Sequence, residues 1–477
     1  MRNGNGKMLL AVALCVGLAW LAVAAPALAA KRPHPSKLAY PAVKLETPKA
    51  EEISLSNGLT GFLLEDHEIP VVDVIILVKT YFPDRSKYGL NGMAQWVIRN
   101  GGTETWPGDK LSDELEFLAA SVEVYGGDLN TTFAFNCIKK DLPRILEIFS
   151  DLVMNPAFPE EKIEMRRNTM LEEIRRRNDE PSSVSRREFA RLVYGDHPYA
   201  WETTPESVKG LTRDDLVSFY NTYFHPNNAI IGISGDVTKD EIVAALDKAL
   251  AGWKQAEVTV PRVPEAQSPP PSCNYVYMDI NQAYISMGHD GINLNNPDRC
   301  AVNIMNFILG GGSFTSWITE KVRSDEGLAY QANSRFTADP WAKGLFTASA
   351  QTKADACARS ITIIQNQIKR MRETGPTEVE VKKAVDSYVN SQVFDYESKA
   401  QVVRRLVELR YQGRPLDSPE RDVETYGKLT VADIKSAAQK YIFPDRLTLL
   451  VVGNKELFDR PLSEFGNVNE IKLEKEQ

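Results

Sequence analysis

The stretch LTRDDLVSFYNTYFHPNNAIIGISG, residues 211–235, returns 218 positions later as LTVADIKSAAQKYIFPDRLTLLVVG, residues 429–453. The two copies share Leu, Thr, Asp, Ser, Tyr, Pro and Gly at equivalent places without a gap. The Leu-Thr-x-x-Asp opening is typical of a helix start, and the apolar run before the last glycine is typical of a buried strand. A period of this length is too long for a solenoid, so the repeat predicts two homologous domains.

The similarity extends upstream of both copies. The first repeat contains Tyr194-Gly195-Asp196-His197-Pro198, and the corresponding segment of the second repeat is Tyr411-Gln412-Gly413-Arg414-Pro415. A long charged helix is expected ahead of each, over Pro159–Arg177 and Pro376–Asp395. The duplication therefore involves much more than one short helix.

Within the first repeat, predicted strands come first and amphipathic helices follow. Strands are expected at Thr60–Glu65, Val71–Lys79, Val122–Tyr125 and Thr131–Cys137, and helices at Asn91–Arg99, Ser112–Ala120, Leu142–Val153 and Glu160–Arg177. Strand pairs mixed with helices predict an α+β fold. We expect two homologous domains, each a mostly antiparallel sheet covered by helices on one side.

A proline-rich segment, residues 256–272, separates the repeats and has the composition of an extended linker. We therefore place an N-terminal domain at 47–255 and a C-terminal domain at 273–466. Residues 467–477 are expected to form a charged tail, and Lys472–Gln477 carry no packing signal.

The first thirty residues read as a targeting segment. Arg2 and Lys7 precede an apolar run from Met8 to Val23, and small residues end at Ala29 and Ala30. This pattern predicts a signal peptide over residues 1–30, followed by an arm over 31–46; an uncleaved anchor is the alternative. No later stretch is long and apolar enough to span a bilayer, so we expect an exported protein, periplasmic or alternatively secreted.

The composition narrows the class of protein further. The chain has 477 residues, 43% of them hydrophobic, and a formal net charge of −8. This balance argues against nucleic acid as a partner and against intrinsic disorder. Beyond the leader the chain has four scattered cysteines, Cys137, Cys273, Cys300 and Cys357, and no spacing identifies a disulfide or a metal site.

The segment GLNGMAQWVIRNGGT, residues 89–103, carries a family resemblance. With the duplicated layout, it resembles the insulinase/pitrilysin peptidase family, in the short two-domain form of mitochondrial processing peptidase and bacterial relatives. That family carries an inverted zinc motif, His-x-x-Glu-His, at this place. Here the two His positions are Gly92 and Trp96, and the catalytic Glu position is Gln95. Gly and Trp cannot bind zinc and Gln cannot act as a general base, so the resemblance implies a chain without metal.

Glu173 matches the family's third zinc ligand, but a single carboxylate cannot hold the metal. We expect it to be a surface acid that pairs with Arg176 or Arg177. The histidines also argue against a zinc site, independently of the resemblance. The chain has five histidines, none spaced three or four residues from another, so no helix presents a two-histidine site.

The second repeat contains an arginine and a tyrosine that match substrate-binding residues of the family. Gly310-Gly311-Gly312 precedes a helix expected over Ile318–Ser324, and Arg323 and Tyr330 lie seven residues apart. The resemblance implies that this pair hydrogen-bonds a substrate backbone in the zinc site and stabilises an oxyanion. The glycines lack the ending of a phosphate-binding loop and are expected to form a tight turn. Trp317 stands where many relatives have Arg.

The chain lacks the zinc residues but retains Arg323 and Tyr330. Within this family, that combination suggests that the chain is one subunit of a heterodimeric protease. Zinc is then expected in a homologous partner, and an unfolded peptide would add as a strand along the edge-strand segment Gly126–Thr132. The alternative is a non-catalytic peptide-binding or assembly protein of the same fold. A homodimer stays open as well.

Overall fold

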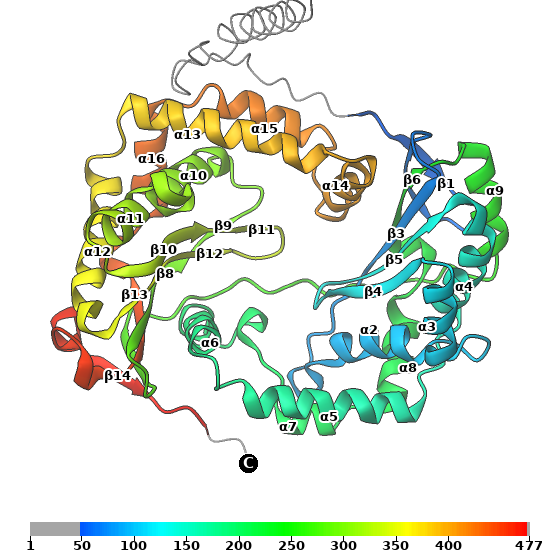
Figure 1. Cartoon of the computed structure of the whole chain (residues 1–477), viewed down its shortest axis with the longest axis horizontal. Coiled ribbons are helices and arrows are strands. Elements are labelled where there is room, and N and C mark those ends of the chain that lie inside the picture. Colours follow the sequence, from blue (N-terminus) through cyan, green and yellow to red (C-terminus); the bar gives the residue numbers. More distant parts are fainter. Residues whose placement is uncertain (1–47, 475–477) are drawn as a thin grey trace, which may run out of the picture. The chain divides into compact units, whose positions relative to one another are not determined.

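The computed structural model describes residues 48–474, so the signal peptide and arm predicted for residues 1–46 lie outside the described residues. Two six-stranded sheets dominate it (Figure 1). The first has the order β1-β2-β6-β3-β5-β4, in which only β2 and β6 pair in parallel. Its strands are β1 (Glu51–Ser54), β2 (Thr60–Glu65), β3 (Val71–Lys79), β4 (Ser121–Gly127), β5 (Asn130–Ile138) and β6 (Ala229–Gly235).

Helices of the first half cover one face of this sheet. They enclose a core in which Met93, Phe149 and Phe219 pack with Phe133 of β5. The helices of the first half are α2 (Leu90–Gly101), α3 (Gly108–Phe117), α4 (Leu142–Met154), α5 (Glu160–Arg176), α6 (Pro181–Tyr194), α7 (Pro205–Lys209), α8 (Arg213–Tyr223) and α9 (Lys239–Ala249), and α6 is the one that contributes no residue to this core. The predicted strands and helices of this half are all present; α3 begins four residues earlier than expected because Gly108 packs directly against the backbone of Asn100.

The second sheet has the order β10-β12-β8-β13-β7-β14 and is also mostly antiparallel. Its strands are β7 (Cys273–Tyr277), β8 (Gln282–Asp290), β10 (Ala329–Phe336), β12 (Leu345–Lys353), β13 (Thr448–Gly453) and β14 (Val468–Ile471). A separate two-residue pairing joins β9 (Ile292–Asn293) to β11 (Ala338–Asp339). Each half therefore has the α+β architecture expected from the sequence.

The helices of the second half are α10 (Arg299–Asn306), α11 (Trp317–Thr319), α12 (Cys357–Glu373), α13 (Glu378–Ser391), α14 (Lys399–Tyr411), α15 (Ser418–Tyr426) and α16 (Val431–Tyr441). The helix predicted over Ile318–Ser324 is present but irregular: it begins as one α-helical turn, α11, and continues as a π-helix from Glu320 to Asp325.

The C-terminal segment also differs from expectation. Residues 468–471, inside the region expected to be a charged tail, form β14 and pair in parallel with β7. Leu473 packs beside Ile471 against buried residues that include Val276 and Val452. Pairing with the edge of the sheet satisfies the backbone whatever the charge of the side chains, which is why the charge pattern was misleading.

The duplication is visible in the helix starts. Thr212 and Asp215 form a reciprocal capping box at the start of α8, and Thr430 and Asp433 form the same box at the start of α16. In both, the threonine hydroxyl accepts from the aspartate N–H and the carboxylate accepts from the threonine N–H. The conserved spacing within the repeat therefore has a structural cause.

Each half also supplies a helix to the other half's sheet (Figure 1). Val403 and Val407 of α14 pack with Phe62, Ile75 and Ile230 of the first sheet. In return, α6 packs Val184, Phe189 and Val193 against β7 and β13 of the second. This exchange covers the face of each sheet that its own helices leave open, and the sequence did not predict it.

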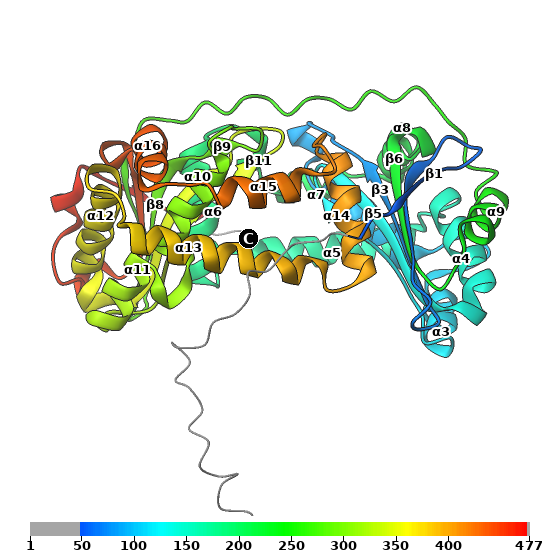
Figure 2. The same ribbon diagram turned by 90° about the horizontal axis from the view of Figure 1, so that it is seen from above.

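Between α9 and β7 the chain has no helix or strand, and it runs as a long extended segment (Figure 2). This stretch includes the proline-rich residues 256–272. Across residues 48–474, no helix combines the length and apolar character that a membrane span requires.

Candidate functional site

Helix α2 carries the three positions that correspond to the zinc motif. Gly92 is exposed, and a Cβ built there would meet nothing within 4 Å. Trp96 is half-buried against the first core. Gln95 is only 7% exposed and lies between them. The helix is thus intact, with an open surface position, a buried amide and a packed indole in place of metal ligands.

Gln95 belongs to a buried hydrogen-bond network that ties α2 to the β4–β5 hairpin. Its Nε2 lies 3.1 Å from the carbonyl oxygen of Asn130 and 3.3 Å from that of Gly127. It also lies 3.1 Å from Oδ1 of Asn91 and 3.2 Å from Oγ1 of Thr131. These partners are acceptors, so the site is built for an N–H donor and not for a carboxylate.

Glu173, the remaining position of the zinc triad, lies on α5 with its side chain 57% exposed. Its Oε1 accepts a 2.8 Å hydrogen bond from Arg166, two turns earlier on the same helix. The expected pairing with Arg176 or Arg177 was wrong: Arg176 pairs with Glu172, and Arg177 with Glu202. Arg176 lies one helical turn after Glu172 and pairs with it. Arg177 follows the last residue of α5 and faces the loop that carries Glu202, so neither arginine pairs with Glu173.

The residues at these positions do not fit a zinc ion. Gln95 is committed to carbonyl oxygens, Glu173 to a guanidinium, and neither Gly92 nor Trp96 offers a ligand atom. In the described part of the chain, no three His, Cys, Asp or Glu side chains are grouped to hold a metal. The four histidines there all make hydrogen bonds within the protein: His67 to Asp236, His197 to Pro264, His225 to Lys254, and His289 to Asp290.

Arg323 and Tyr330 come together at the start of edge strand β10. The guanidinium carbon of Arg323 lies 5.4 Å from the centre of the Tyr330 ring and 4.6 Å from that of Phe314. Tyr330 is 76% exposed, because a break in the β10–β12 register falls between Ala329 and Gln331. Within residues 48–474 no carboxylate pairs with Arg323, so its N–H donors are available.

Phe314 was missed by the sequence reasoning. It is 59% exposed, which is unusual for a phenylalanine, and covers one face of the Arg323 guanidinium. A signal was available, because Phe314 lies two residues after the glycine triplet and nine before Arg323. The triplet does not form the expected tight turn, since Gly310 and Gly311 end a π-helix that begins at Phe307, but it does allow close packing: a Cβ at Gly310 would lie 2.3 Å from the backbone nitrogen of Ser334 on β10.

Trp317, the departure from many relatives, is buried and structural. Its indole nitrogen donates a 2.7 Å hydrogen bond to Glu380, and the Arg370 guanidinium stacks 3.7 Å from its ring centre. It therefore joins α11 to α12 and α13.

The segment Gly126–Thr132 spans the turn between β4 and β5, and β4 is the edge of the first sheet. Glu123 and Tyr125 of β4 are exposed. A free strand edge offers unpaired N–H and C=O groups to an extended peptide.

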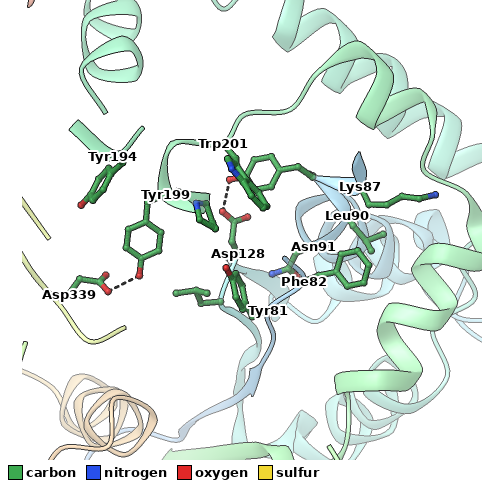
Figure 3. A pocket seen from close by; sticks show the side chains of 14 residues that line it. Tyr81, Phe82, Lys87, Leu90, Asn91, Asp128, Tyr194, Tyr199, Trp201 and Asp339 are labelled. Atoms are coloured by element: carbon green, nitrogen blue, oxygen red, sulfur yellow. Dashed lines mark hydrogen bonds between the residues drawn. The ribbon is translucent and has the colours of Figure 1, made fainter. Parts of the chain in front are cut away.

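A pocket that the sequence did not predict lies beside this turn, at the first turn of α2 (Figure 3). Its volume is about 390 Å³. It brings Asp128 of the hairpin together with Asp339 of the other half, far away in the sequence. Only the three-dimensional fold makes this proximity visible.

Comparisons with known proteins agree with this structure. A sequence profile described as "Insulinase (Peptidase family M16)" matches residues 91–204, and one described as "Peptidase M16 inactive domain" matches residues 210–388. An "Uncharacterized zinc protease" of Rickettsia bellii is 24% identical over 416 residues, which cover 84% of this chain and 97% of that protein. A "Non-peptidase homolog YmxG" of Helicobacter pylori is 24% identical over 379 residues, covering 78% and 86%.

Solved structures share the fold. The peptidase M16 inactive domain from Pseudomonas fluorescens matches with a TM-score of 0.79 at 22% identity, covering 87% of this chain and 100% of that one. A protease from Helicobacter pylori matches with a TM-score of 0.76 at 20% identity, covering 86% and 100%. Since the two profiles together match more than half of the sequence and the architecture agrees, the chain belongs to the insulinase family, peptidase family M16.

Proposed function

We propose that this chain is the subunit without metal of an exported, insulinase-type zinc endopeptidase, and that it supplies Arg323 and Tyr330 in trans to a zinc-bearing homologue. The partner carries the His-x-x-Glu-His motif and its zinc. The substrate is an unfolded peptide of limited size.

One observation carries the proposal. The Arg323 guanidinium lies against the rings of Phe314 and Tyr330 and has no carboxylate partner in the described chain, and Tyr330 is itself largely exposed. A guanidinium and a phenol side by side are suited to donate hydrogen bonds to a peptide carbonyl oxygen as negative charge develops there. Neither side chain is needed for the core of this half, from which both are absent.

The absence of zinc ligands on α2 supports a division of roles between two chains. The chain's own zinc positions hold no ligand set, and Gln95 is bonded into the hairpin. Arg323 and Tyr330 would therefore have no reaction to serve within a single copy. A reaction centre on another chain gives them one.

The exposed edge of β4 supports an extended peptide as the ligand. A peptide added there gains main-chain hydrogen bonds that do not depend on its sequence. The same edge supports the second candidate, a peptide-binding or assembly protein without proteolysis; the Helicobacter pylori relative is described as a non-peptidase homologue.

The deciding experiment measures zinc-dependent cleavage of unstructured peptides by this chain, by its His-x-x-Glu-His homologue, and by their mixture. We expect cleavage in the mixture alone. Arg323→Ala or Tyr330→Ala in this chain should lower kcat/KM on the order of a hundredfold, the usual cost of losing one transition-state donor. Arg335→Ala, an exposed arginine further along β10, and Tyr277→Ala, an exposed tyrosine on β7, are matched controls that should leave the rate unchanged.

A homologue that cleaves equally well without this chain, or a mixture indifferent to both substitutions, would contradict the trans role. Peptide binding without cleavage in any mixture would favour the second candidate. Zinc-dependent cleavage by this chain alone would overturn the assignment of Gly92, Gln95 and Trp96.

Export is part of the proposal and has its own test. The mature protein should begin after Ala29 or Ala30, and mass spectrometry of the native protein measures this directly. Cell fractionation then separates a periplasmic from a secreted location.

A further inference from the structure

The pocket at the first turn of α2 is built from both halves of the molecule (Figure 3). Three parts of the first half and one residue of β11 contribute to it. Its lining includes Tyr81, Tyr88, Asp128, Tyr199, Trp201 and Asp339. We call it the α2 pocket.

Two carboxylates of the α2 pocket have no cationic partner. Asp128 accepts a 2.7 Å hydrogen bond from the hydroxyl of Tyr88, and Asp339 accepts one of 2.7 Å from the hydroxyl of Tyr199. Oδ1 of Asp339 also accepts from the N–H groups of Trp341 and Ala342. Neutral donors orient both carboxylates; Asp128 is exposed and Asp339 is half-buried, and within residues 48–474 neither takes part in an ion pair.

The lysine that lines the α2 pocket does not neutralise them. Nζ of Lys87 donates to Asp215 at 2.7 Å and to the carbonyl oxygen of Gly210 at 2.9 Å. Figure 3 shows its side chain pointing away from Asp128. Both carboxylates are therefore open to a cation from outside the described chain.

Aromatic rings form much of the pocket wall. The rings of Tyr88 and Trp201 lie perpendicular to one another with centres 6.0 Å apart, and those of Tyr194 and Tyr199 do so at 5.7 Å. Ring faces attract ammonium and guanidinium groups and also accommodate the apolar stem that carries such a group. Carboxylates beside aromatic faces thus select organic cations over metal ions.

An unused hydroxyl provides an independent indication of a ligand. Tyr81 is 4% exposed, and its Oη has no hydrogen-bond partner in the described chain. Figure 3 shows this hydroxyl directed toward Asp128, and burial together with the charge of Asp128 raises the pKa of Tyr81. A buried hydroxyl without a partner costs free energy, which a bound group that hydrogen-bonds to it would recover.

We propose that the α2 pocket binds an organic cation, a primary ammonium or guanidinium group on an aliphatic stem, between Asp128 and Asp339, with Tyr81 hydrogen-bonded to it. The cation is either a free small amine or a basic side chain of a bound peptide. The pocket lies at the hairpin that ends edge strand β4, where a peptide added to that edge would reach it. The inference goes beyond the proposed function, because cation binding requires neither the partner subunit nor zinc.

The test is isothermal titration calorimetry on the whole mature chain, with butylammonium, butylguanidinium and the neutral analogue butylurea. We expect saturable binding at one site for at least one of the cations and none for butylurea. Asp128→Asn and Asp339→Asn keep the acceptor oxygens for Tyr88 and Tyr199 but remove the charge. Each should weaken binding about tenfold or more, the effect of one charge-assisted contact. Asp113→Asn, an exposed aspartate on α3, controls for general charge and should have no effect.

Tyr81→Phe separates ligand binding from structure. Because the hydroxyl has no partner within the described protein, the variant should keep the thermal stability of the parent and still bind the cation more weakly. A loss of stability in Tyr81→Phe would overturn the argument from the unused hydroxyl. No saturable binding of either cation, equal binding of butylurea, or binding unchanged in both aspartate variants would overturn the proposal.

The same titration with acetyl-Ala-Ala-Arg-Ala-Ala-amide and its citrulline counterpart identifies the source of the cation. Tighter binding of the arginine peptide than of butylguanidinium would assign a peptide side chain. Binding of the free cation alone would assign a small amine. Failure of all these ligands leaves the cleavage assay with the homologue unaffected, so the two ideas fail separately.

Discussion

Gln95 stands where active members of the insulinase family have a general base, and its surroundings have become those of an amide. The carbonyl oxygens of Gly127 and Asn130 face its Nε2, and Asn91 completes the shell. A carboxylate at this place would meet acceptors and little else. Restoring the zinc motif therefore requires a change in the hairpin as well as in α2.

Gln95→Glu alone should lower the free energy of unfolding by about 1–3 kcal/mol at pH 8, since it buries a charge against acceptor oxygens. The same environment raises the folded-state pKa of the new carboxyl above its unfolded value of about 4.3. The penalty should therefore grow as the pH rises above that value, and it should be smaller at pH 5, where the protonated acid can donate to a carbonyl. Urea unfolding at both pH values measures it.

Gln439→Glu, on the exposed surface of α16, is the matched control and should cost little at either pH. A Gln95→Glu protein as stable as the parent at pH 8 would mean that the hairpin readily rearranges around a carboxylate.

Residue chemistry at the zinc positions was predictable because it depends only on which side chains stand there. The partner of Glu173 was not, since three arginines, Arg166, Arg176 and Arg177, lie on its face of the helix and the sequence does not order them. The α2 pocket was beyond sequence reasoning for another reason. Its two aspartates are more than 200 residues apart, in segments with no shared pattern.

At the scale of elements, Gly232 sets how closely α14 approaches the first sheet. A Cβ there would lie 2.5 Å from Cγ1 of Val403 and 2.9 Å from Cγ2 of Val407. The equivalent residue of the second repeat is Leu450, which packs with α6. The two exchanged helices thus rest on unequal surfaces, a glycine in one sheet and a leucine in the other.

Gly232→Ala should lower the free energy of unfolding by about 1–3 kcal/mol through overpacking. Combining it with Val403→Ala, which vacates the contact, should recover part of the loss. Gly92→Ala is a control that should change stability in the opposite direction. A Cβ there has no atom within 4 Å, and alanine in a helix should raise the free energy of unfolding by about 0.5–1 kcal/mol. Thermal unfolding of the parent, the three single variants and the double variant checks the order, and an additive double variant would show that Gly232 and Val403 do not touch.

Most elements were predictable because apolar periodicity and capping residues are local signals. The start of α3 depends on packing between Gly108 and Asn100, and β14 depends on a pairing across nearly 200 residues. Which sheet a helix covers is likewise non-local. Nothing in the amphipathic pattern of α6 or α14 says that its apolar face belongs to the other repeat.

At the scale of the whole molecule, the exchange of α6 and α14 means that the linker is not what holds the halves together. Cleavage within an engineered protease site at the exposed Gln267 should leave both fragments in one native complex. Size-exclusion chromatography should show a single species at the parent's elution volume, which separates only when urea unfolds it. Elution of two independent fragments without denaturant would contradict the packing of the exchanged helices.

The exchange has a further consequence for how such a chain could arise. A single ancestral half would have carried one helix too many for its own core and one bare sheet face. Two copies that exchange these helices solve both problems, so the same packing would also suit two separate copies of one half. Within one chain the two halves need not stay identical, and their exchanged helices already rest on different residues, Gly232 in one sheet and Leu450 in the other.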